Sequence, residues 1–217
     1  TVLGLGAAIE FIHSYSLIHD DLPCMDDADE RRGQPSTHKA FGEGVAVLAG
    51  DVLNTEAFSV LTNIYGTNPA LCVALIRGLA EAAGMQGMAG GQGLDMEIRG
   101  VEPTEEMLVA LYRKKTGALL RFAVTGSALI SAGSDEQLKA LEVYADSLGL
   151  LFQITDDLMD FDQSDEEPCM VRVLGREKTL ERCNDLIKKG NQAVALLGES
   201  AKGLELLLQE VFRRIEA

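Results

Sequence analysis

The 217-residue sequence predicts an all-α protein. Long segments carry apolar residues at the three- and four-residue spacing of helices that bury one face. Runs that alternate apolar and polar residues, as half-buried strands do, are essentially absent. The prolines fall at plausible helix ends, where a missing amide is best tolerated: Pro23, Pro35, Pro69, Pro103 and Pro168.

Six segments are expected to be helical. From Leu3 to His19 the apolar residues are dense enough for a helix buried on most sides, and Gly50 to Ile64 is expected to form another. Residues 105–130 and 136–161 have helical spacing, and glycines within the former allow close packing or a kink. The chain from 177 onward adds two amphipathic segments. Because no linker or repeat separates these segments, residues 1–217 are expected to form a single domain.

The composition narrows the function classes. A formal charge of −15 argues against nucleic acid, whose phosphates require a basic surface. No uninterrupted apolar run approaches the roughly 20 residues of a membrane span, so none is expected. The four cysteines are scattered, which predicts reduced thiols and a cytoplasmic location. Because the sequence begins at Thr1 without a methionine, an organellar location after removal of a targeting segment stays open.

Two acidic clusters follow apolar helical segments. The first contains Asp20, Asp21 and Asp26, and the second contains Asp156, Asp157 and Asp160. A lone acidic run is usually a solvated helix end, but two such clusters favour a functional site. In the second cluster, carboxylates four residues apart share a helix face, and their apolar neighbours imply partial burial, which is costly without a cation. Ligands that are all oxygen favour Mg²⁺, with Mn²⁺ as a substitute, over zinc.

The ordered set of motifs resembles the trans-prenyltransferases of the polyprenyl synthetase family, which include farnesyl and geranylgeranyl diphosphate synthases. The resemblance extends over nearly the whole chain and depends on the set, since any one tripeptide is weak. It implies an isoprenoid synthase type of helical bundle around a central cavity, with the two aspartate motifs facing each other. The segments that carry it are Ser16–Pro23, Arg31–Gly33, His38–Lys39, Gly50–Asp51, Gly90–Gln92, Lys115–Gly117 and Phe152–Asp160.

The resemblance also assigns roles to residues at matching positions. All six aspartates would hold Mg²⁺ on the allylic diphosphate. Arg31 and Lys115 match contacts to that diphosphate, whereas Arg32 and His13 match contacts to isopentenyl diphosphate. The catalytic positions at the reaction centre are Lys115, Thr116 and Gln153, which also bind substrate. Taken singly, these residues also fit structural roles: a core histidine, surface charges, a hydroxyl bonded to the helix backbone and a polar core bridge.

The implied reaction joins isopentenyl diphosphate to dimethylallyl or geranyl diphosphate. Metal ions and basic side chains neutralise the departing diphosphate, the double bond of isopentenyl diphosphate attacks the allylic cation, and a proton is lost. An apolar cavity would keep water from the cation. No protein nucleophile is needed, and the sequence offers no Ser-His-Asp or Cys-His arrangement.

Tyr15 and Ser16 are the expected chain-length determinants. Tyr15 precedes Asp20 by five residues, roughly 7.5 Å along a helix. A bulky ring at this depth, with a first motif lengthened by two residues near Pro23-Cys24, resembles bacterial-type farnesyl synthases and predicts a fifteen-carbon product. Geranylgeranyl synthases tend to have a smaller residue here. Ordinary core packing is the structural alternative for Tyr15.

The sequence departs from the family pattern at two places. The Gly-Lys-Arg segment that precedes the first motif in the family is absent. After the second motif, residues 162–167 run directly into Pro168-Cys169, where the family has a loop rich in glycine and lysine. We therefore expect flexible segments of the protein to be missing from this sequence, with a break near 162–168.

Two other functions share many of these features. A class I terpene cyclase has the same fold, but usually carries an Asn/Ser/Glu triad as its second motif and lacks the Arg31-Arg32 pair. A regulatory subunit of a prenyl synthase often loses motif residues, whereas both motifs are present here. The family resemblance further implies a homodimer.

Overall fold

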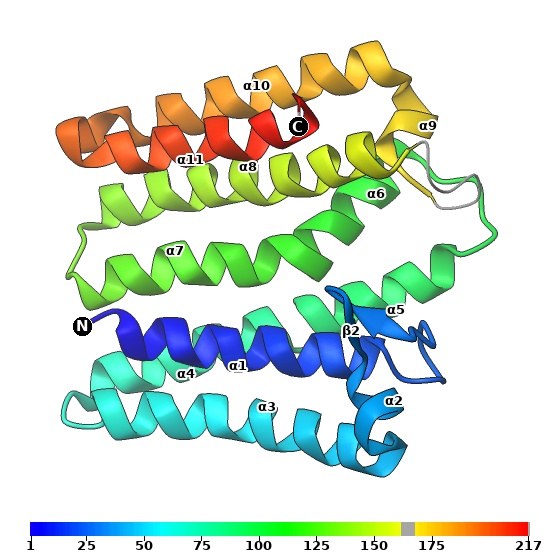
Figure 1. The fold of residues 1–217 in the computed structure, drawn as a ribbon. Coiled ribbons are helices and arrows are strands. Elements are labelled where there is room, and N and C mark those ends of the chain that lie inside the picture. Colours follow the sequence, from blue (N-terminus) through cyan, green and yellow to red (C-terminus); the bar gives the residue numbers. More distant parts are fainter. Residues whose placement is uncertain (162–167, 217) are drawn as a thin grey trace. The chain divides into compact units, whose positions relative to one another are not determined.

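The computed structural model describes residues 1–161 and 168–216, and its chain divides into two compact units, Thr1–Leu79 and Ala80–Ala217. Among the described residues both units are built of helices, apart from one hairpin of two-residue strands in the first (Figure 1). The predicted all-α class is confirmed. The units are described one at a time below, and the single domain stays a prediction.

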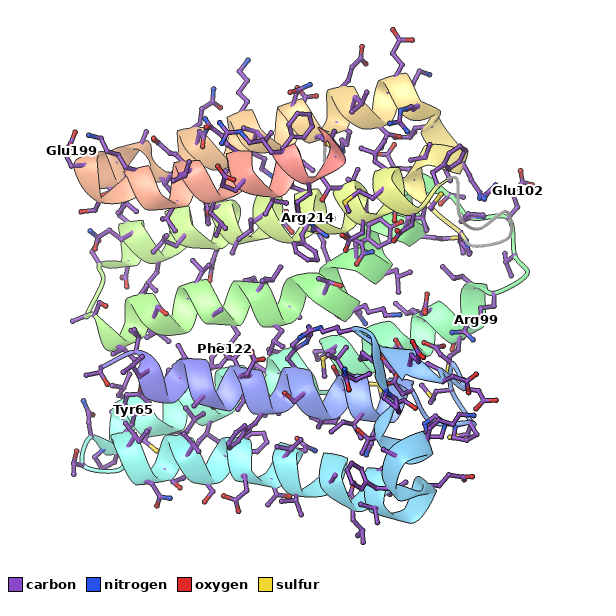
Figure 2. The ribbon with its side chains drawn as sticks, viewed as in Figure 1. Tyr65, Arg99, Glu102, Phe122, Glu199 and Arg214 are labelled. Carbon is purple, nitrogen blue, oxygen red and sulfur yellow. The ribbon has the colours of Figure 1, made fainter. Side chains whose placement is uncertain are left out.

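In the first unit, α1 (Leu3–Asp20) packs along α3 (Glu43–Tyr65). Leu5, Ala8 and Ile12 of α1 are buried in this unit's core. The hydroxyl of Tyr65 (labelled in Figure 2) donates to the carbonyl of Thr1 at 2.7 Å and accepts from the amide of Leu5 at 3.2 Å. This hydroxyl therefore ties the start of α1 to the end of α3.

Shorter elements complete the first unit. The chain after α1 forms a hairpin of β1 (Glu30–Arg31) and β2 (Gln34–Pro35), followed by α2 (Thr37–Phe41), which packs on α3. The first unit ends at Leu79 within α4 (Pro69–Ala83), a helix that begins with a proline, where the missing amide costs nothing. The side chain of Asn68 accepts from the amide of Leu71 and caps this helix.

The second unit is built around α8 (Asp135–Asp160), against which α7 (Ala118–Ile130) and α10 (Arg176–Val194) pack. A capping box formed by Ser134 and Gln137 starts α8. The remaining elements are α5 (Met88–Ile98), α6 (Glu105–Tyr112), the π-helical turn η1 (Arg113–Gly117), α9 (Met170–Leu174), the 3₁₀ segments η2 (Ala195–Ala201) and η3 (Arg214–Glu216), and α11 (Lys202–Arg213).

α3 is the one helix in the described part of the chain that is long and apolar enough to cross a membrane. Core helices of soluble proteins meet the same criterion. Asp51 and Glu56 lie in the middle of α3, where a membrane span would bear the largest cost for a charge. The expected absence of a membrane span stays a prediction.

The expected helices agree with the structure at most ends. Residues 3–19 and 136–161 correspond to α1 and α8 within one or two residues. The helix expected from Gly50 instead begins at Glu43, and the one expected over 105–130 is divided by the π-helical turn. α4, α5 and the hairpin were not expected. The expected break near 162–168 falls on residues outside the described part of the chain.

Candidate active site

The first aspartate cluster begins where α1 ends. Asp20 is the last residue of the helix and Asp21 is its C-cap. Asp21 is only 2% exposed, and its carboxylate accepts three hydrogen bonds from Arg31: two from Nε at 2.9 and 3.0 Å and one from Nη2 at 2.7 Å. This fork-shaped pair raises the pKa of Arg31. Asp21 therefore positions an arginine that was predicted to bind diphosphate.

A backbone contact brings the predicted metal ligands of this cluster together. The amide of Asp26 donates to the carbonyl of Asp20 at 3.0 Å, so the chain turns back on the end of α1. Lys39 supports the far side of the turn by donating to Asp29 at 2.8 Å and to Asp27 at 3.4 Å. The turn thus places two carboxylate residues, six apart in sequence, next to each other.

The hairpin presents the two predicted substrate arginines differently. Arg31 pairs with Gln34 across the hairpin, so Arg32 and Gly33 form its two-residue loop. Both loop residues have positive φ, 55° and 74°, as a type I′ turn requires. Arg31 is directed to the aspartate cluster, whereas Arg32 is exposed at the tip.

The predicted His13, Tyr15 and Ser16 lie half-buried along α1. The hydroxyl of Ser16 donates to the carbonyl of His13 at 2.9 Å. The Tyr15 ring contacts the ring of His19, one turn closer to the aspartate cluster. Burial, and to a lesser extent the charge of Asp20, raises the pKa of the Tyr15 hydroxyl, which therefore stays neutral.

The second aspartate cluster lies on the last turns of α8. Asp160 is exposed, whereas Asp156 is about a quarter exposed and accepts a hydrogen bond from Arg214 at 2.5 Å. Burial raises the pKa of Asp156, and the positive charge of Arg214 opposes this shift. The cluster therefore holds one carboxylate in solvent and one beside a basic side chain.

Asp157 faces the core of the second unit. It is 9% exposed, and its Oδ2 accepts from the hydroxyl of Tyr112 at 2.6 Å and from the amide of Met170 at 2.7 Å. Burial raises its pKa to about 6, although both hydrogen bonds lower it. Asp157 thus joins α8 to α6 and to the start of α9, and metal binding by this residue stays a prediction.

The predicted catalytic residues come together at the π-helical turn η1. Lys115 donates to Asp95 of α5 at 2.8 Å, and the hydroxyl of Thr116 donates to the Oε1 of Gln153 on α8 at 2.8 Å. A Cβ on Gly149 would lie 2.8 Å from the Cα of Gly117, so only glycine lets α8 approach the turn this closely. π-helical turns are frequent at functional sites.

The donor set fits a hard divalent cation. The predicted ligands are all carboxylates, and the described contacts place Asp26 beside Asp20 while leaving Asp160 exposed on the face of Asp156. In the described ranges 1–161 and 168–216, no group of three or more His, Cys, Asp and Glu side chains is close enough to hold a metal. The approach of the two aspartate clusters stays a prediction.

Four residues that contact predicted site residues were not themselves predicted from the sequence. They are His19, Asp95, Tyr112 and Arg214, which contact Tyr15, Lys115, Asp157 and Asp156 respectively. His19 and Asp95 lie next to or shortly after motif residues, so their positions offered a signal. Tyr112 falls in the segment expected to be helical over 105–130, but its hydroxyl partner lies 45 residues away and no local pattern indicates it. Arg214 lies 58 residues from Asp156, and no local pattern marks it.

Comparison with known proteins identifies the family to which this chain belongs. The sequence model described as polyprenyl synthetase matches residues 1–179. Farnesyl diphosphate synthase of Bacillus subtilis is 44% identical over 165 residues, which cover 75% of this chain and 56% of the relative. The corresponding enzyme of Escherichia coli is 40% identical over 230 residues, covering 96% of this chain and 76% of the relative. This chain therefore spans little more than half of the Bacillus relative.

Related proteins include enzymes with other products. Geranylgeranyl pyrophosphate synthase 7 of Arabidopsis thaliana is 45% identical, covering 76% of this chain and 48% of its own length. Among solved structures, an FPP/GFPP synthase from Zymomonas mobilis superposes with a TM-score of 0.91 at 38% identity, covering 96% of this chain and 75% of that one. The predicted isoprenoid synthase type of fold is thereby confirmed.

Proposed function

Because this chain belongs to the polyprenyl synthetase family, we propose that it condenses isopentenyl diphosphate with dimethylallyl and geranyl diphosphates to give farnesyl diphosphate. One observation carries the proposal. The turn after α1 holds aspartates and a paired arginine, and α8 and η1 hold the second aspartate cluster with the Thr116–Gln153 hydrogen bond. These groups support the proposal, because ionisation and condensation of diphosphates need carboxylates for metal and basic side chains for the departing charge.

Each basic residue has a distinct task in this proposal. Arg31 and Lys115 bind the allylic diphosphate, and each is held by one carboxylate, Asp21 or Asp95, that fixes its position. Arg32, exposed at the hairpin tip, binds isopentenyl diphosphate with His13. Because the charges of Arg31 and Lys115 are positioned before substrate arrives, they stabilise the charge that develops on the leaving group.

The remaining groups handle the metal and the carbocation. When bound by the aspartates, Mg²⁺ supplies the charge neutralisation that makes diphosphate a good leaving group. Gln153 orients the Thr116 hydroxyl, so an oxygen is held at the predicted reaction centre. The fit of an all-carboxylate donor set to Mg²⁺, with Mn²⁺ as substitute, supports the choice of metal.

Tyr15 supports the fifteen-carbon product. Its ring is half-buried five residues before the first aspartate and is fixed by contact with His19. A bulky ring at that depth would stop the growing tail after a short extension. The geranylgeranyl synthase among the relatives makes a twenty-carbon product the second candidate.

An apolar stripe on α3 supports a homodimer. Val45, Leu48 and Val52 are all more than half exposed and follow one face of the helix at spacings of three and four residues. A contiguous exposed apolar stripe of this kind usually marks an interface. We propose that a second copy of this chain covers it. The four cysteines are unpaired thiols, which supports a cytoplasmic location.

Product analysis tests the proposed function. The purified full-length protein is incubated with Mg²⁺, isopentenyl diphosphate and either dimethylallyl or geranyl diphosphate, and products are separated after dephosphorylation. Farnesol from both primers supports the proposal, and geranylgeraniol identifies the second candidate. A cyclised hydrocarbon would indicate a terpene cyclase. No product without an added catalytic partner would indicate a regulatory subunit.

A further inference from the structure

Arg214 contacts the second aspartate cluster from the far end of the chain. Figure 2 labels this residue in the C-terminal segment η3, and its Nη2 donates to the Oδ1 of Asp156 at 2.5 Å. Nothing in the motif itself specifies this partner, since the two residues are 58 positions apart.

The guanidinium is held in a defined place. Its central carbon lies 4.5 Å from the centroid of the Phe152 ring, one turn before Asp156 on α8. A cation over an aromatic face is attracted by the ring, and more strongly where water is partly excluded. The side chain is 34% exposed, so the contact with Asp156 is partly shielded from solvent. The ring contact and the partial burial therefore fix the position of the Arg214–Asp156 ion pair.

One nitrogen of the same guanidinium is left without a partner. Nη1 of Arg214 is buried and makes no hydrogen bond among the described residues. Burying an N–H of a charged group without an acceptor is costly. The hydrogen bond to Asp156 and the contact with the Phe152 ring must therefore offset the cost of leaving Nη1 unpaired.

A carboxylate oxygen bound to a guanidinium is less available to another cation. Mg²⁺ takes oxygen ligands at short distances and attracts the same lone pairs that Arg214 uses. Asp156 is one of the predicted metal ligands, so the protein's own cation and the metal would compete for it.

We propose that Arg214 is the resident counter-ion of Asp156 and weakens the affinity of the second aspartate cluster for divalent cations. This inference rests on the proposed role of Asp156 in binding metal. It gives the C-terminal segment a role in the metal response of a site that lies far from it in sequence.

Binding of Mn²⁺ alone, followed by electron paramagnetic resonance at pH 8, tests the inference without turnover. Arg214→Gln removes the guanidinium charge and should bind Mn²⁺ about fivefold more tightly, the factor that corresponds to about 1 kcal/mol. Arg213→Gln is the matched control, because it removes the same charge one residue away, from an exposed pair with Glu210. Its affinity should equal that of the wild type.

Two further variants serve as an alternative to Arg214→Gln and as a control for the role of Asp156. Phe152→Leu removes the ring under the guanidinium without a change in charge and should also tighten Mn²⁺ binding, which keeps the test open if Arg214→Gln does not fold. Asp156→Asn should abolish the difference, so that Asp156→Asn and the double variant with Arg214→Gln bind Mn²⁺ alike. Equal Mn²⁺ binding by wild type and Arg214→Gln, or binding by neither, overturns the inference.

The outcome is separable from that of the proposed function. If the wild type makes prenyl products while Arg214→Gln binds Mn²⁺ like the wild type, the inference fails and the function stands. If the wild type makes no product but Arg214→Gln binds Mn²⁺ more tightly, the function fails and the competition at Asp156 stands.

Discussion

The imidazole ring of His19 meets the ring of Tyr15 edge to face, with centroids 5.7 Å apart and planes at 76°. The Nε2 of His19 also lies 3.1 Å from the carbonyl oxygen of Val47 on α3. The space for this imidazole exists because residue 50 is glycine, where a Cβ would lie 2.0 Å from Nε2. Tyr15 is thus held by a chain of contacts that ends on a second helix.

Replacing Tyr15 by alanine should lengthen the product. The change removes the ring five residues before the aspartate cluster and opens space for further isoprene units. Gas chromatography of the dephosphorylated products should show geranylgeraniol or longer alcohols in place of farnesol. Tyr15→Phe keeps the ring and serves as the control. An unchanged product length in Tyr15→Ala would assign Tyr15 to core packing alone.

Gly50→Ala should displace the His19 ring and destabilise the protein. Forcing a methyl group into a filled space typically costs about 1–3 kcal/mol, measured as the free energy of unfolding in urea. The control is Gly44→Ala, in the same helix, where a Cβ meets nothing within 4 Å. That variant should be neutral or slightly more stable, since alanine favours helices. Equal stability of the two variants would refute the proposed fit of His19.

Thr116→Val should slow product formation, because it removes the hydroxyl that Gln153 orients. The lost hydrogen bond also leaves a half-buried amide oxygen unpaired, at a cost of about 1 kcal/mol in unfolding free energy. Steady-state rates with geranyl and isopentenyl diphosphates check the first effect. Thr125→Val is the control, since that hydroxyl bonds only to the carbonyl of Arg121 in its own helix. A normal rate in Thr116→Val would leave the hydrogen bond a structural role alone.

Tyr112→Phe and Asp157→Ala should destabilise the second unit without additive effects. Each removes one partner from a buried pair joined at 2.6 Å, so each should cost about 1–3 kcal/mol. Because both report the same hydrogen bond, the double variant should lose less than the sum of the two. Denaturant unfolding of all four proteins measures this coupling. Strict additivity would show that the two side chains do not stabilise one another.

Leu48→Glu should convert the proposed homodimer to a monomer. The new carboxylate would be buried at the centre of the apolar stripe on α3, where an unpaired charge is costly. Light scattering after size-exclusion chromatography measures the mass. Leu206→Glu makes the same change on α11, where Leu206 is also exposed, and should leave the mass unaltered. A Leu48→Glu variant that remains dimeric would place the interface elsewhere.

The parts of the fold that follow a regular period were predictable from the sequence. α1 and α8 have long uninterrupted patterns, so both were located within two residues. The π-helical turn was not predictable, because one extra residue in a helical turn hardly alters the spacing of its apolar residues. The hairpin was missed for a similar reason: its strands are two residues long, too short to show an alternating pattern of apolar and polar residues.

A contact within the site was predictable where both of its residues belonged to motifs that the family resemblance assigns to the same part of the site. Thr116 and Gln153 were assigned to one reaction centre, and the structure joins them by a hydrogen bond. The inward orientation of Asp157 was not foreseen, because a run of aspartates does not reveal which carboxylate faces a buried tyrosine. Arg214 was not foreseen either, since its attraction to Asp156 depends on how the chain returns to α8.

The two hydrogen bonds of Asp157 join three helices of the second unit. Through Met170, this carboxylate fastens the start of α9 to α8 independently of the residues between them. The same oxygen accepts from Tyr112 at the end of α6, so local unfolding that exposes Asp157 would release the ends of three helices in one cooperative event.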